Sequence, residues 1–77
     1  MERTEWIEAF ATALGVPAPS ETEVQTVLEV AALAAHASER TAAPVACWIA
    51  AQAGLSVDQA VKVAREVGSG TSQVETQ

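Results

Sequence analysis

The chain has 77 residues, a length that fits one small domain. Hydrophobic residues make up 49% of it, but 17 residues are alanine, so the core can only be thin. The net charge of −6 disfavours binding to nucleic-acid phosphates, and a single cysteine excludes an internal disulfide and a cysteine-rich zinc site. With neither an apolar run of membrane-spanning length nor a signal-peptide pattern, the sequence predicts a cytoplasmic protein without membrane contact.

The first predicted helix covers residues 4–14. Its large apolar side chains recur at a spacing that places them on one face, and they are Trp6, Ile7, Phe10 and Leu14. Gly15 readily adopts positive φ, and Pro17 prevents the helix from resuming. The helix should therefore end at residue 14.

The second predicted helix runs from a capping box to about residue 38 and is the longest of the chain. In that box the Ser20 hydroxyl accepts from a backbone N–H three residues later, and Glu23 reaches back to the Ser20 N–H. From Val27 onward the helix is apolar around most of its circumference. Such a helix is typical of a central position with neighbours on two sides.

The third predicted helix begins after Thr41, which is placed to cap it, and carries Pro44 in its first turn. Alanines on one side are small enough to let another helix approach closely. The other side is lined by Val45, Trp48, Ile49 and Gln52. Gly54 is placed to end the helix.

The fourth predicted helix opens on a second capping box, Ser56 with Gln59, and ends at Gly68. Residues 69–77 are predicted to form a disordered tail. Because no segment alternates with the period of a strand, the prediction is an all-α fold. It consists of a compact four-helix bundle over residues 1–68, with the second and third helices at its core.

His36, the only histidine, lies near Glu39 and Arg40 at the end of the second helix. It could contact a ligand, or it could cap its helix and hold the following turn. Cys47 stands among apolar residues, which favours a small buried hydrophobe over a reactive thiol. The sequence shows no catalytic arrangement, metal-ligand spacing or glycine-rich nucleotide loop, so we expect neither enzymatic activity nor a cofactor.

Trp6 and Trp48 stand at helical positions that usually pack into a core. A small bundle can nevertheless leave a tryptophan half exposed, and such a residue commonly anchors a protein interface. Both interpretations stay open from the sequence.

Several short motifs resemble a family of small helical domains of unknown function that is common in actinobacteria. The matching residues are Trp6, Leu14-Gly15, Ala35-His36, Arg40 and Ala42-Ala43-Pro44. Members of that family occur alone, or attached to or encoded near the guanylyltransferase that converts molybdopterin to its guanine dinucleotide form. The resemblance spans about residues 5–67 and implies an accessory role in molybdenum cofactor synthesis. This chain carries Ala32-Leu33 where the family tends to have Arg-Asp.

The leading hypothesis is a non-catalytic helical module that binds a protein partner, with the molybdenum cofactor guanylyltransferase as the candidate. The predicted binding residues are His36, Arg40, Thr41, Pro44 and Trp48. A second hypothesis is a structural homodimer that pairs through small-residue helix faces. A third is an anion- or nucleotide-binding accessory domain that uses His36 and Arg40, which the acidity of the chain disfavours.

Overall fold

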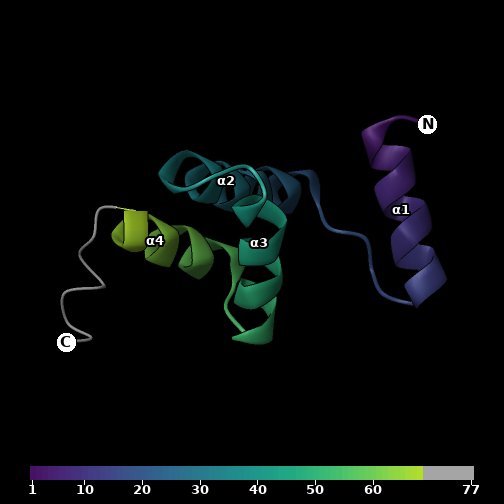
Figure 1. Cartoon of the computed structure of the whole chain (residues 1–77). Helices are drawn as coiled ribbons and strands as arrows, with labels where there is room; N and C mark the ends of the chain where they lie inside the picture. The colour runs from purple at the N-terminus through teal and green to yellow at the C-terminus, as the bar shows by residue number, and fades with distance from the viewer. Residues whose placement is uncertain (69–77) are drawn as a thin grey trace.

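The computed structural model describes residues 1–68, and this part of the chain forms four helices. They are α1 (Arg3–Leu14), α2 (Glu21–Ala37), α3 (Ala42–Gln52) and α4 (Val57–Gly68) (Figure 1). The predicted all-α class with four helices is confirmed, and residues 1–68 contain no strand. The predicted tail, residues 69–77, lies outside the described residues. None of the described helices combines the length and apolar character that crossing a membrane requires.

Both predicted capping boxes are present and set the starts of two helices. The Ser20 hydroxyl accepts the Glu23 N–H at 3.1 Å, and the Glu23 carboxylate accepts the Ser20 N–H at 2.8 Å. At the start of α4, the Ser56 hydroxyl accepts the Gln59 N–H at 3.2 Å, and the Gln59 side-chain oxygen accepts the Ser56 N–H at 3.0 Å. Each box satisfies backbone donors that the first turn of a helix leaves free.

The remaining helix ends follow the sequence signals less uniformly. Gly15 and Gly54 have φ values of 74° and 75°, a left-handed conformation that favours glycine and ends α1 and α3. Thr41 precedes α3 as predicted, but its side chain makes no capping hydrogen bond. Instead, the N–H groups of Ala42 and Ala43 donate to carbonyl oxygens of the preceding turn.

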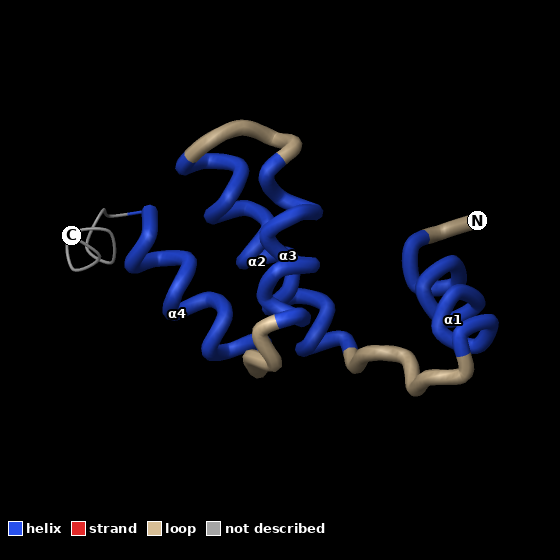
Figure 2. The backbone as a smooth tube through the Cα atoms, turned by 60° about the horizontal axis from the view of Figure 1, so that its bottom comes forward, coloured by secondary structure: helices blue, strands red, loops and turns tan. Residues whose placement is uncertain are grey.

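Helix α2 is the centre of the fold, because it packs along both α3 and α4 (Figures 1 and 2). The predicted central position of this helix is thereby confirmed, although α4 packs against it as extensively as α3 does. Its Val30 is 5% exposed, and Ala60 of α4 is 7% exposed. An ion pair between Glu29 and Arg65 also joins α2 to α4. The core thus centres on α2 and extends to two helices rather than to α3 alone.

Helix α1 stands to one side of the other three and is connected by residues 15–20 (Figures 1 and 2). It meets the first turn of α2 through an ion pair between Arg3 and Glu21 at 3.7 Å. A cavity of about 230 Å³, lined in part by Ile7, Pro19 and Val24, lies at this junction. Proline supplies no backbone N–H and fixes φ, so the segment around Pro17 and Pro19 continues as an extended connection.

Candidate functional site

Helix α3 contains no charged residue, yet α2 covers only one of its sides. The covered side carries small residues, among them Ala43, Ala46 and Ala50, all of them partly buried. The opposite side carries large apolar side chains, which we name the α3 face: Val45, Trp48 and Ile49, exposed by 55%, 64% and 56%. A helix that is apolar all round is normally covered all round, so the α3 face is suited to contact another molecule.

Helix α1 presents a second exposed apolar stripe, which we name the α1 face: Trp6, Phe10 and Leu14. Their spacing of four residues places them on one face, as the sequence predicted. Of the two interpretations left open for Trp6, the exposed one is observed, since Trp6, Phe10 and Leu14 are exposed by 54%, 51% and 61%. The rings of Trp6 and Phe10 instead stack on each other with centroids 4.9 Å apart. The extended connection around Pro17 and Pro19 keeps this stripe away from α3.

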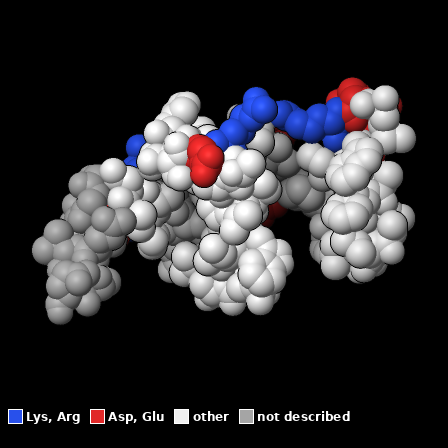
Figure 3. Space-filling model, in the orientation of Figure 1, with Lys and Arg blue, Asp and Glu red and all other residues white. Residues whose placement is uncertain are grey.

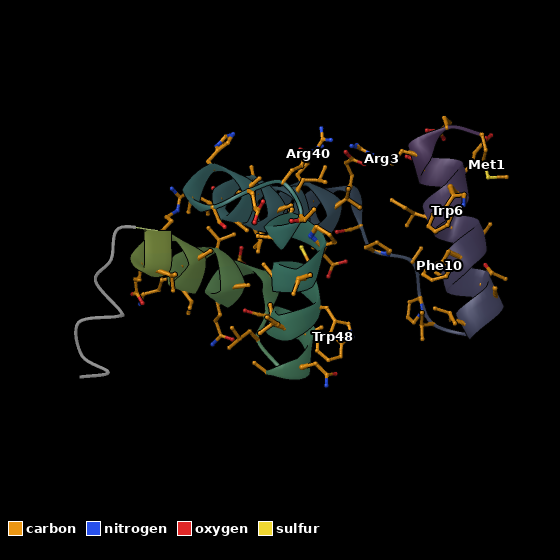
Figure 4. The ribbon with its side chains drawn as sticks, viewed as in Figure 1. Met1, Arg3, Trp6, Phe10, Arg40 and Trp48 are labelled. Carbon is orange, nitrogen blue, oxygen red and sulfur yellow. The ribbon has the colours of Figure 1, made fainter. Side chains whose placement is uncertain are left out.

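The aromatic residues of the α1 face and the α3 face are seen from the same viewpoint in Figure 4. Figure 4 shows Trp6 and Phe10 along α1, and Trp48 on the edge of α3 that is nearer to α1. In the same orientation, Figure 3 shows this side uncharged over most of both helices, with acidic and basic side chains gathered along its upper edge. The two helices run in the same direction (Figure 1), so the exposed stripes form two roughly parallel rows.

The structure brings together four of the five predicted binding residues and separates the fifth. Thr41, Pro44 and Trp48 are exposed and share one side of α3 by their spacing, and Arg40 directly precedes them. His36 is also exposed, but it lies on the side of α2 that carries Glu29, the residue paired with α4. Its side chain makes no hydrogen bond or ion pair with the described residues, so the capping interpretation receives no contact in support.

Sequence reasoning missed the full extent of the exposed surface. Val45 and Ile49 belong to it beside Trp48, and so do Phe10 and Leu14 of α1. The sequence pattern of α3 could have predicted it, because α3 has alanines on one side and large apolar residues on the other. A helix that packs closely on its alanine side leaves its large apolar residues without a neighbour.

Cys47 lies at the α2–α3 contact and is partly buried. Its Sγ atom is 3.9 Å from the carbonyl oxygen of Val27, and burial raises the pKa of the thiol. A raised pKa lowers the fraction of reactive thiolate at neutral pH. The observed surroundings agree with the interpretation of Cys47 as a small packing residue.

The described residues contain no group of three or more His, Cys, Asp or Glu side chains that could hold a metal ion. In comparison with known proteins, the model of a family described as a domain of unknown function (DUF6457) matches residues 1–76. No curated protein and no solved structure matches the chain.

Proposed function

The chain belongs to the DUF6457 family, and we propose that it is a non-catalytic helical module that binds a protein partner. The observation that carries this proposal is the α3 face, in which Trp48 is 64% exposed between Val45 and Ile49. Tryptophan is enriched among the residues that dominate the energy of protein interfaces. An apolar centre with a polar rim is the usual anatomy of such an interface.

The rim of the proposed interface is supplied at the start of α3. Arg40 is exposed and makes no ion pair with the described residues, so its guanidinium is available to a carboxylate or carbonyl group of the partner. Thr41 and Pro44 lie between Arg40 and Trp48 on the same side of the helix. His36 lies on the side of α2 that carries Glu29 and is not part of α3. We therefore assign it a smaller part in this interface than Arg40.

The candidate partner is the molybdenum cofactor guanylyltransferase, and the proposed setting is the cytoplasm of an actinobacterium. This part of the proposal is supported by the family resemblance of Trp6, Ala35-His36 and Ala42-Ala43-Pro44. The module would then be an accessory to synthesis of the guanine dinucleotide cofactor. Its contribution would come from binding the enzyme, without chemistry of its own.

The test is isothermal titration of the full chain with the purified guanylyltransferase of the same organism. The variant Trp48→Ala should weaken binding by roughly 30-fold, the effect of losing one strong interface anchor. The variant Val63→Ala, at a 42% exposed position of α4, is the matched control and should bind as the native chain does. Circular dichroism should stay unchanged in both variants, because both side chains are largely exposed.

Two results would contradict the proposal at different levels. Absence of binding by the native chain at micromolar concentration would remove this enzyme as the partner. Equal affinity of the Trp48→Ala and native chains would show that the α3 face is not the binding surface. A folded Arg40→Ala variant with reduced affinity would locate the rim at the start of α3.

A further inference from the structure

We infer that two copies of this chain associate face to face in solution, with the α1 face of each copy covering the α3 face of the other. This inference goes beyond the proposed function, because it concerns the free chain; since both use the α3 face, a second copy and the guanylyltransferase would compete for it. The described residues include only three buried apolar residues, Ala11, Val30 and Ala60, whereas two rows of large apolar side chains are exposed.

The size of the exposed surface fits a dimer interface. An aromatic side chain contributes about 150–250 Å² of burial, so the exposed parts of Trp6, Phe10 and Trp48 alone offer roughly 250–400 Å². The other members of the two faces add to this surface, since Leu14, Val45 and Ile49 are exposed by 55–61%. A standard interface buries about 800 Å² on each partner, and the two faces together approach that size.

The charge distribution favours a second copy over a charged partner. Each chain carries a net charge of −6, which would repel a second copy if the charges met in the interface. Charged side chains instead gather along the upper edge of this side, while most of the surface over α1 and α3 is uncharged (Figure 3). Such a surface offers little to pair with a charged partner, but it fits another uncharged apolar surface of the same kind.

The geometry of the two rows satisfies a two-fold axis. Helices α1 and α3 have 12 and 11 residues, so each is about 17–18 Å long. They run in the same direction (Figure 1), and Figure 4 shows Trp6 and Phe10 along α1 and Trp48 on the edge of α3 that is nearer to α1. Rotation about an axis parallel to the two helices and lying between the copies places α1 of each copy opposite α3 of its partner. Both contacts form at once, which is what a closed dimer requires.

The start of α1 contacts α2 and not α3. The ion pair between Arg3 and Glu21 and the cavity lined by Ile7 and Pro19 place the first two turns of α1, at the edge of its apolar stripe, against the start of α2. The stiff segment around Pro17 and Pro19 holds this arrangement. The α1 face is therefore free to contact a second copy while its own helix stays in place.

The experiment is light scattering after size-exclusion chromatography over a range of concentrations, on the full native chain and on three charge variants. The native chain should show twice the 8.0 kDa mass of one chain. The variants Phe10→Glu in the α1 face and Ile49→Glu in the α3 face should each weaken association by about 100-fold or more, since each buries an unpaired charge in the interface. The variant Val63→Glu in α4, outside both faces, should remain a dimer.

The outcomes separate the possible arrangements. A dimer that Ile49→Glu disrupts and Phe10→Glu leaves intact would overturn the inference in favour of an α3–α3 contact. A native chain that is monomeric at all concentrations would overturn it as well, whether α1 closes onto its own α3 or a different protein covers both rows. The Phe10→Glu variant also distinguishes this inference from the proposed function, because it should lose the dimer while keeping the α3 face available to the guanylyltransferase.

Discussion

Replacing Val30 by alanine tests whether the core centres on the α2–α4 contact. Val30 is 5% exposed and borders an open apolar cavity of about 140 Å³ that is shared by α2, α3 and α4. The substitution removes two buried methyl groups at about 0.8 kcal/mol each, and the enlarged cavity adds about 1 kcal/mol. The higher helix propensity of alanine returns about 0.5 kcal/mol, which leaves a net loss of about 2 kcal/mol.

A loss of that size should lower the melting temperature by about 8–16 °C in a domain of this length. The assay is thermal and urea unfolding followed by circular dichroism, at one fixed chain concentration. Val63→Ala makes the same chemical change at a 42% exposed position and should alter stability by no more than about 0.5 kcal/mol. If the two variants unfold alike, Val30 is not in the core and the packing of α2 against α4 is misjudged.

Two further measurements test local features of the fold. Replacing Ser56 by alanine removes the acceptor of the Gln59 N–H and should lower the free energy of unfolding, measured in urea, by about 1 kcal/mol. The control is Ser38→Ala at the end of α2. It should lower the free energy of unfolding by less, because the Ser38 hydroxyl makes no hydrogen bond with the described residues. Iodoacetamide at pH 8 should alkylate Cys47 more slowly in the folded chain than in urea, by on the order of tenfold, because burial raises the pKa of the thiol. Equal rates in the two states would contradict the partial burial of Cys47.

The helices of this protein were largely predictable because their signals are local. Ser20 with Glu23 and Ser56 with Gln59 set two starts, and Gly15 and Gly54 set two ends. Each of these signals acts within one helical turn, so a short stretch of sequence contains all the atoms involved. The central position of α2 was also predictable, since its apolar circumference requires neighbours on two sides.

Local sequence signals do not predict which apolar faces are covered by another helix and which stay exposed. Periodicity places Trp6, Phe10 and Leu14 on one face of α1, but it does not say which helix lies opposite that face. In this chain the extended connection after Gly15 sets α1 beside the start of α2, where Arg3 pairs with Glu21, and not against α3. His36 illustrates the same limit, because its distance from Trp48 depends on how α2 and α3 pack.

The central place of α2 has a consequence for the order in which the protein forms during translation. Both helices that cover α2 follow it in the chain, and 31 residues separate the end of α2 at Ala37 from the end of α4 at Gly68. At about 5–20 residues per second, the ribosome adds those residues over roughly 2–6 s. Helix α2 gains its first partner only once α3 is complete at Gln52, and its second only once α4 is complete at Gly68. The packed core therefore forms only after the last helix has been synthesised, so the fold is completed at the end of translation and not helix by helix.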